Sequence, residues 1–356
     1  MRWLARESGG RDEVANLIAE APSLVQVTGR PWENLLANIV GFGRNTTGGA
    51  GAALYHVTNL NDSGAGSLRA GAESATPYWI VFDVSGTITL TSTIYVESNK
   101  TIDGRGANIV LAGKGLTLGN WDNNGKTTTN VILHNFTYAD ATSYVFKIGI
   151  TPRASNIWVD HITFEQFSSG IDDAEGLYVG GNGTDATSPP HNITVSWCRF
   201  NGANPGNIPK AILVSSESGD AEDVAGTITA HHNWFNQLDH RTPYMFHVSY
   251  HSFNNFLDRG EIAAQVGLDG QYLSENDILR EPYGGAYPRI KHITTWGNAV
   301  SIKVTNPWLF TGGEDIEEFN TGGIFTPPYP YSLSTANSTL QTDIEAGSGW
   351  QDVELP

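Results

Sequence analysis

Three stretches of the chain decide its fold: NIWVDHITF at residues 156–164, NITVSWCRF at 192–200 and GTITAHHNWF at 226–235. Each opens with Asn or Gly and continues through β-branched residues, which favour strands. Each then carries a polar or turn-forming pair, namely Asp160-His161, Trp197-Cys198 or His232-Asn233. The stretches are therefore copies of one degenerate repeat with irregular spacing.

Further runs of the same kind extend this pattern in both directions. A repeat that cannot bury its apolar face alone must stack on its neighbours, so the sequence predicts an all-β solenoid of parallel coils with inward apolar and Asn ladders. The residues between 180 and 191 are predicted to be a loop that projects from one side. A β-sandwich is the alternative, but it requires hairpin signals that are scarce here. The further runs are ALYHVTNL (53–60), YWIVFDVSG (78–86), NKTIDGRG (99–106), NVILHNFTY (130–138), HVSYHSFNNF (247–256) and IKHITTWGN (290–298).

The chain divides into three parts by pattern. Residues 1–35 are predicted to be an N-terminal capping segment, with a short helix over RDEVANLIAE at 11–20 because its apolar residues share one face. Residues 36–300 are predicted to form the β-helix. Residues 301–356 are rich in Gly, Pro, Thr and aromatics, and are predicted to be an irregular tail that packs along the outside of the coil.

Composition narrows the class of protein. Forty glycines, ten tryptophans and two methionines among 356 residues favour β-structure with many turns. An excess of 37 acidic over 20 basic residues, a net charge of -17, argues against nucleic-acid binding. No stretch approaches the roughly 20 apolar residues of a membrane span, and MRWLARESGG is not a signal peptide because no apolar region follows its charges. The single cysteine, Cys198, lies in an apolar run and is predicted to pack in the core.

Residues 227–255 concentrate the cations of this acidic chain. They include Arg241 and five histidines, and such a concentration indicates that an anion is handled there. Arg241 is followed by Thr242-Pro243, and the proline stiffens the backbone. An arginine acts as a base only where neighbouring cations disfavour its charged form, and His240 and Lys210 are candidates for that role. A surface arginine before a turn is the simpler interpretation.

Two other positions could carry chemistry. Lys210, ahead of a β-run, could bind a carboxylate as a point charge, or could be a solvated lysine at a strand end. The acidic patch Asp172, Asp173 and Glu175 could bind Ca²⁺, supply a general acid and base, or form an acidic turn. His231 and His232 are adjacent, so on a strand they are expected to point to opposite faces and not to share a metal.

An ordered set of motifs resembles one known family. GFGRNTTGG, YHVTNLNDSGAGSLR, IVFDVSGTI and KTIDGRG precede NIWVDHITF, which is similar to the family's WxDH coil. KAILVSS, HHNWF, RTP and HSFNN then follow in the family's order. From about Ile39 to Phe256 the chain resembles the pectate lyases of polysaccharide lyase family 1, which are right-handed parallel β-helices.

The resemblance implies an enzyme, a polysaccharide lyase that cleaves a uronic-acid polymer by β-elimination. Arg241 matches the arginine that takes the C5 proton, and Lys210 matches the lysine that binds a substrate carboxylate. His240 and His251 are further candidates for substrate contact. Ca²⁺ is the implied cofactor, with Asp173 and Glu175 as its candidate ligands.

Departures from the family pattern concern mainly the calcium site. Phe246 stands where the family has a second arginine, and Val179 stands where it has the later of two acidic residues. The stretch SYVFKI (143–148) lacks the two aspartates that the family has there. The calcium site is therefore expected to be reduced.

The implied setting is a secreted monomer that acts on an acidic polysaccharide, pectate or polygalacturonate, without nucleic-acid or membrane partners. Two alternatives stay open from the residues. One is a glycoside hydrolase on the same architecture, which would use aspartates such as Asp172 and Asp173. The other is a non-catalytic carbohydrate-binding β-helix, an adhesin or virion spike, which would suit the loss of metal ligands.

Overall fold

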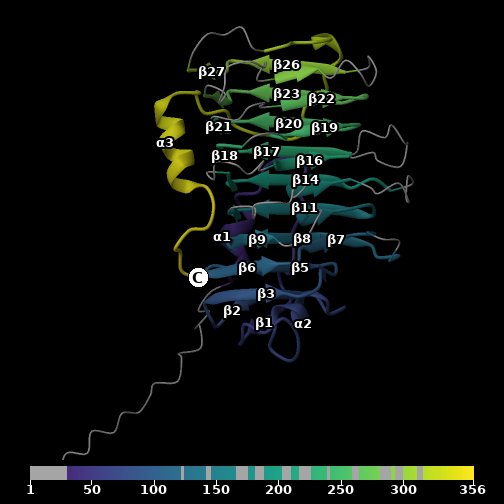
Figure 1. Cartoon of the computed structure of the whole chain (residues 1–356), viewed down its shortest axis with the longest axis vertical. Coiled ribbons are helices and arrows are strands. Elements are labelled where there is room, and N and C mark those ends of the chain that lie inside the picture. Colours follow the sequence, from purple (N-terminus) through teal and green to yellow (C-terminus); the bar gives the residue numbers. More distant parts are fainter. Residues whose placement is uncertain are drawn as a thin grey trace, which may run out of the picture.

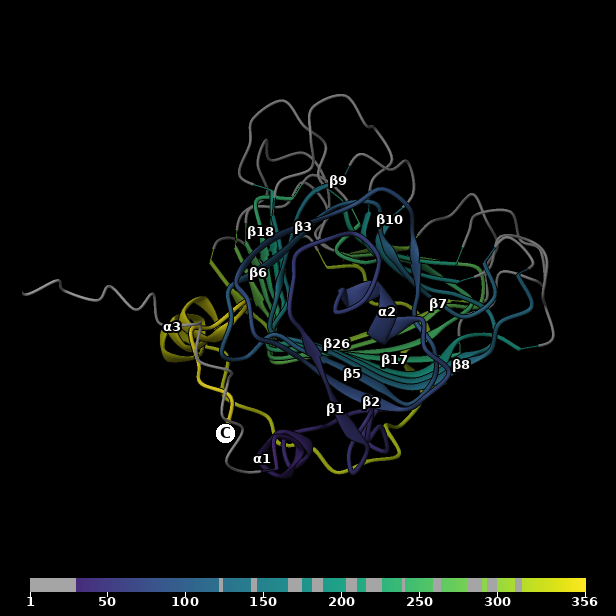
Figure 2. The same ribbon diagram turned by 90° about the horizontal axis from the view of Figure 1, so that it is seen from below.

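The described strands wind around one axis as three parallel sheets, A, B and C (Figures 1 and 2). Each coil passes through the sheets in the order A, B, C. The predicted helix at 11–20 lies outside the described residues. This computed structural model describes residues 30–121, 124–141, 146–165, 175–180, 188–202, 210–215, 226–238, 241–258, 264–280, 290–292, 300–310 and 316–356.

The strands of each sheet follow one another in coil order. Sheet A contains β1 (Ala53–Val57), β2 (Tyr78–Phe82), β5 (Lys100–Asp103), β8 (Thr128–His134), β11 (Ala154–Asp160), β14 (His191–Ser196), β17 (Thr227–His231), β20 (Ser249–Phe253), β23 (Gln271–Glu275) and β26 (Ser301–Thr305). Sheet B contains β3 (Gly86–Leu90), β6 (Ile109–Gly113), β9 (Thr137–Ala141), β12 (Thr163–Phe164), β15 (Arg199–Asn201), β18 (Trp234–Asn236), β21 (Phe256–Asp258), β24 (Ile278–Leu279) and β27 (Trp308–Leu309). Sheet C contains β4 (Ile94–Tyr95), β7 (Leu116–Leu118), β10 (Phe146–Ile150), β13 (Glu175–Val179), β16 (Lys210–Val214), β19 (Tyr244–Phe246), β22 (Ala264–Gly267) and β25 (Ile290–His292).

The corner between sheets A and B explains the repeat seen in the sequence. NITVSWCRF forms β14 and β15, and the chain bends between them at Trp197, whose φ is 49°. His161, His232 and Asn254 occupy the same left-handed position on other coils, with φ values of 51°, 55° and 52°. Asn tolerates this conformation better than most residues. The predicted parallel β-helix is therefore confirmed, with each turn-forming pair at a corner.

Inward-facing side chains stack at the spacing of the coils. The rings of Phe164, Phe200 and Phe235 lie nearly parallel, with centroids 4.5 and 5.0 Å apart, close to the distance of about 4.8 Å between neighbouring strands. The side-chain amide of Asn233 donates to the side-chain oxygen of Asn255, 2.9 Å away on the next coil. The apolar and Asn ladders predicted from the sequence are both present.

The N-terminal end of the coil is covered by α2 (Leu68–Ala72), which lies across it in Figure 2. Leu68 and Ala72 are fully buried there in the main core. Ser67 caps this helix by accepting a hydrogen bond from the backbone N–H of Ala70. The sequence pattern alone does not predict this cap.

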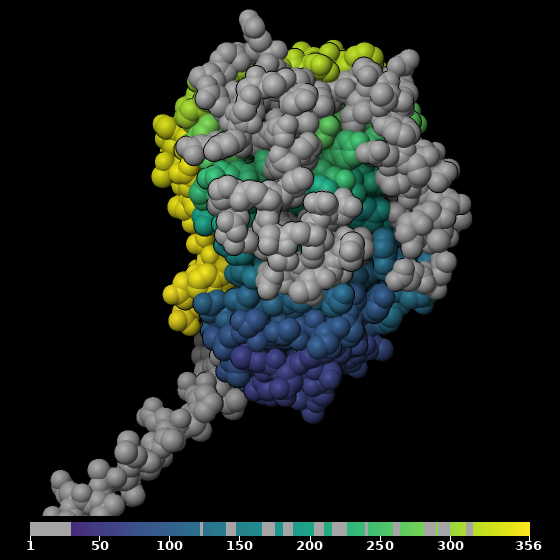
Figure 3. Space-filling model, in the orientation of Figure 1, coloured from purple at the N-terminus to yellow at the C-terminus, as the bar shows by residue number. Residues whose placement is uncertain are grey.

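The C-terminal segment lies along one side of the coil, yellow in Figure 3. Its helix α3 (Ser338–Gly347) packs Leu340 and Ile344 against Phe256 and Ile278 of sheet B. A short 3₁₀ helix, η3 (Thr321–Gly323), precedes it. The sequence predicts that the coil ends at residue 300, whereas β26 and β27 continue it to Leu309.

The segment before β1 packs on the outside of sheet A. It contains α1 (Trp32–Leu36) and then Gly41, whose φ is +103°. A Cβ atom at Gly41 would lie 2.6 Å from Oγ1 of Thr194, so a larger residue would push the segment off the sheet. The backbone N–H groups of Phe42 and Gly43 donate to the hydroxyls of Thr229 and Thr194. These contacts fix α1 beside the corner of sheets A and B.

Candidate active site

Glu175 and Lys210 begin two neighbouring strands of sheet C. They are register partners, as the first residues of β13 and β16. Both side chains are buried, and Glu175 is 3% exposed. The two side chains therefore leave the backbone side by side on adjacent coils, whose strands are about 4.8 Å apart.

Arg241 lies on the next coil, beside β16. It immediately precedes Thr242-Pro243 and β19, which pairs with β16 from Leu213 and Tyr244 onward. The carbonyl of Arg241 accepts a hydrogen bond of 2.8 Å from the backbone N–H of Ile212. Its φ of 64° is uncommon for a residue with a side chain, and such conformations cluster at functional sites.

The guanidinium of Arg241 forms an ion pair with the carboxylate of Glu175. It also lies over the ring of Tyr244, 5.7 Å from the ring centroid. Arg241 thus reaches back past the strand of Lys210. The arrangement places two cations and one carboxylate where the chain enters sheet C, and this suits the binding of a second carboxylate.

The remaining predicted residues lie elsewhere or outside the described residues. His251 is fully buried in sheet A, where its ring nitrogens contact the hydroxyl of Tyr329 at 2.7 Å and the carboxylate of Glu275 at 3.0 Å. The structure therefore does not bring His251 to Arg241 and Lys210. Asp173 and His240 lie outside the described residues.

Comparisons with known proteins identify the family of this chain. The sequence profile described as "Pectate lyase" matches residues 14–352. The chain belongs to the pectate lyase family. It is thus a polysaccharide lyase, and the predicted family and enzyme class are confirmed.

Individual members of the pectate lyase family show how far the likeness extends. The chain is 26% identical to pectate lyase 1 of Cryptomeria japonica over 343 residues, which are 86% of this chain and 85% of that one. Its fold is similar to that of jun a 1, the major allergen of cedar pollen, with a TM-score of 0.69, 23% identity, and coverage of 89% and 94% of the two chains. It is also similar to a pectate lyase of Bacillus sp. N165 in complex with trigalacturonate, with a TM-score of 0.64, 22% identity, and coverage of 88% and 98%.

The described residues at this site do not by themselves fit the calcium ion that the family implies. Ca²⁺ takes six to eight oxygen ligands. Among the described starts of the sheet C strands, Glu175 supplies one carboxylate, and it is already paired with Arg241. Phe146 is its register partner on β10, and Val179 lies in the core. A calcium site here would need further oxygen ligands besides Glu175.

Two features of the described residues were not predicted correctly from the sequence. The expectation that His231 and His232 point to opposite faces is wrong: their Nδ1 atoms lie 3.0 Å apart because the chain bends at His232. The sequence pattern identifies Asp160-His161 as a turn-forming pair, but it does not indicate the cluster that these residues form with His134.

Other expectations can be compared directly with the described residues. Cys198 is fully buried and has a free thiol, as predicted. Phe246, which replaces the family's second arginine, is also buried, with its ring against Tyr244. Among the helices of the described part of the chain, none is both long enough and apolar enough to span a membrane.

Proposed function

We propose that this chain cleaves pectate or polygalacturonate by β-elimination at the start of sheet C. The observation that carries the proposal is the gathering of Lys210 and Arg241 around Glu175 on neighbouring coils of a chain with a net charge of -17. An acidic chain repels a polyuronate, so cations are needed where the sugar carboxylate binds. Homologous lyases named for this substrate support the same reaction.

In the proposed reaction, Lys210 binds the uronate carboxylate. Its charge stabilises the negative charge that builds up on that carboxylate as the C5 proton leaves. Arg241 takes the C5 proton, the C5–H electron pair forms the C4=C5 double bond, and the C4–O bond breaks. The leaving oxygen then gains a proton from water or a nearby polar side chain. The product carries a 4,5-unsaturated end.

The ion pair between Arg241 and Glu175 bears on how this reaction can start. A carboxylate neighbour favours the protonated guanidinium, whereas a cationic neighbour such as Lys210 disfavours it. Arg241 can therefore act as a base only after its contact with Glu175 opens. We propose that the arriving polysaccharide displaces Glu175 from Arg241, which couples substrate binding to the release of the base.

The test is ultraviolet absorbance of unsaturated ends, measured with polygalacturonate and then with other uronic polysaccharides. Growth of absorbance supports elimination. New reducing ends without absorbance would indicate a hydrolase, and binding without turnover would indicate a carbohydrate-binding protein. Each reaction is run with Ca²⁺ and with chelator. Loss of activity that Ca²⁺ restores would support Asp173 and Glu175 as ligands. Activity that survives the chelator would mean that Lys210 neutralises the uronate carboxylate without a metal ion.

The remaining proposals concern the setting of the enzyme. We propose a secreted monomer, because its substrate is a polysaccharide too large to enter a cell. Gel filtration of the full chain tests the monomer, and assay of culture medium against cell lysate tests secretion.

A further inference from the structure

A cavity of about 510 Å³ lies on the corner of sheets A and B, away from the start of sheet C where Glu175 and Lys210 lie. Residues of α1 and of the C-terminal segment, among them Asn34 and Gln351, complete its wall. Four imidazoles line it, those of His134, His161, His231 and His232. The proposed lyase reaction uses none of them.

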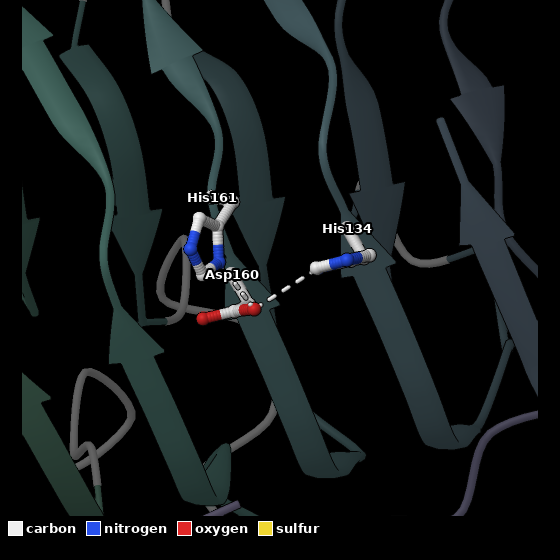
Figure 4. Close-up of side chains that lie close together, drawn as sticks. All are labelled: His134, Asp160 and His161. Atoms are coloured by element: carbon white, nitrogen blue, oxygen red, sulfur yellow. Dashed lines mark hydrogen bonds and ion pairs between the residues drawn. The ribbon is translucent and has the colours of Figure 1, made fainter. Parts of the chain in front are cut away.

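Three of the side chains in this cavity converge on one point (Figure 4). Nδ1 of His134 lies 2.9 Å from Oδ2 of Asp160, and Nδ1 of His161 lies 2.7 Å from the same oxygen. The two imidazole rings stand nearly perpendicular, at 79°. The other oxygen of Asp160 accepts a hydrogen bond of 2.6 Å from Ser196, which fixes the carboxylate.

The fold does not require a histidine at position 161. Other coils place Asn135, Asn254 and Asn276 at the same left-handed corner, with φ values of 60°, 52° and 51°. His134 lies on β8 as the register partner of Asp160 on β11. His161 therefore adds a second imidazole beside a buried carboxylate at a corner where asparagine suffices.

The spacing of these atoms suits a metal ion. Transition-metal ligands lie at about 2.0–2.1 Å from the ion, so two ligands are about 2.9 Å apart at right angles and about 3.3 Å apart at the tetrahedral angle. The two nitrogen–oxygen distances, 2.7 and 2.9 Å, are close to the right-angle value, which Ni²⁺ and Cu²⁺ favour. Imidazole with carboxylate suits Zn²⁺, Ni²⁺ or Cu²⁺, whereas Ca²⁺ prefers oxygen ligands alone. We propose that His134, Asp160 and His161 form a binding site for a divalent transition-metal ion, with its remaining coordination positions facing the cavity.

The alternative is a cluster held by hydrogen bonds alone, with Asp160 accepting a hydrogen bond from the Nδ1–H of each imidazole. Calorimetric titration of the chelator-treated full chain with ZnCl₂ separates the two possibilities. One ion per chain, and a thermal midpoint that rises with added Zn²⁺, supports the metal site. Titration with CoCl₂ adds a visible absorption band that reports coordination by protein ligands.

Two matched variants locate the ion. His161→Asn installs the residue found at this corner on other coils, so it should fold, and it should weaken Zn²⁺ binding at least tenfold. His232→Asn makes the same change two coils further along, outside the cluster, and should leave the affinity within about twofold. Circular dichroism and the thermal midpoint without metal check the fold of both variants. His134→Gln provides a second test of the cluster.

Three outcomes would overturn the proposal. The wild-type chain could bind no more Zn²⁺ than His161→Asn, in which case the cluster holds protons only. His232→Asn could lose binding while His161→Asn keeps it, which would place the ion at the His231–His232 pair. Zn²⁺ could also bind at several ions per chain without a change in the thermal midpoint, which would indicate nonspecific surface binding.

Discussion

The guanidinium of Arg241 pairs with the carboxylate of Glu175 although the strand of Lys210 lies between their coils. Parallel β-helices make such contacts possible because residues far apart in sequence share one line along the coil axis. The pair buries a carboxylate that is 3% exposed against a cation, which avoids the cost of an isolated buried charge. It also ties the proposed base to a candidate metal ligand.

Replacement of Arg241 by lysine should lower kcat about 100-fold or more. Lysine keeps the charge but lacks the planar fork of the guanidinium, and loss of a general base typically costs a factor of 10² to 10⁴. The initial rate of absorbance growth on polygalacturonate measures the effect. Arg280→Lys is the matched control, because Arg280 pairs with Asp258 at the end of sheet B. A rate near that of the wild-type chain would remove Arg241 from the role of base.

Lys210→Met should raise KM for polygalacturonate at least tenfold. The methionine side chain has a similar length but cannot pair with a carboxylate, and a charge-assisted hydrogen bond contributes roughly 1.5–3 kcal/mol. The effect should shrink with methyl-esterified substrate, which has no charge at that position. Lys126→Met, which removes a half-exposed lysine paired with Glu97, serves as the control. An equal rise in KM with both substrates would contradict carboxylate binding by Lys210.

The strands of sheets A and B were predictable because each run carries a strong local signal. NITVSWCRF has β-branched residues on both sides of a turn-forming pair, and it forms β14 and β15. The strands of sheet C are harder to find in the sequence. β19 has three residues, Tyr244–Phe246, and gains its hydrogen bonds from neighbouring coils that lie far away in sequence.

The site was predictable residue by residue through the family motifs, but its contacts were not. Arg241 and Glu175 are 66 positions apart, and nothing in either local sequence indicates that they pair. His251 was predicted to lie near Arg241 because the two residues are close in sequence, and this prediction is wrong. The chain turns from sheet C to sheet A between Phe246 and Ser249, so His251 faces Tyr329 and Glu275.

The histidine pair illustrates how one backbone angle changes a prediction. Alternation along a strand places adjacent side chains on opposite faces, but β17 ends at His231 and the chain bends at His232, where φ is 55°. The two rings meet as a result.

The free energy of unfolding should fall as the pH is lowered from about 6.5 to about 4. Burial, with a smaller effect of His232, lowers the pKa of His231 to about 3, and burial lowers the pKa of His232 to about 4. In the unfolded chain both titrate near 6.5, so the unfolded state binds more protons across this window and acid favours it. Urea unfolding at several pH values measures the slope.

His232→Asn should make that slope shallower, because one of the two depressed imidazoles is removed. His191→Asn changes an exposed histidine and should leave the slope unchanged. Below about pH 4 a second loss should follow from Asp160. Burial raises the pKa of this carboxyl, but His161 and His134 overcome the effect and the net shift is downward. An equal slope in wild type and His232→Asn would contradict the assignment to His232.

Asn255→Ala should destabilise the fold by about 3 kcal/mol or more. The side-chain oxygen of Asn255 accepts from the backbone N–H of Asn233 at 2.9 Å, and its amide donates to the carbonyl of Ala230 at 2.9 Å. Both partners are buried, and each would lose a hydrogen bond at a cost of about 1–3 kcal/mol. Asn61→Ala, at an exposed turn, should stay within about 0.5 kcal/mol of the wild-type value. Chemical denaturation measures both variants, and equal midpoints would show that water enters the coil and replaces the Asn ladder.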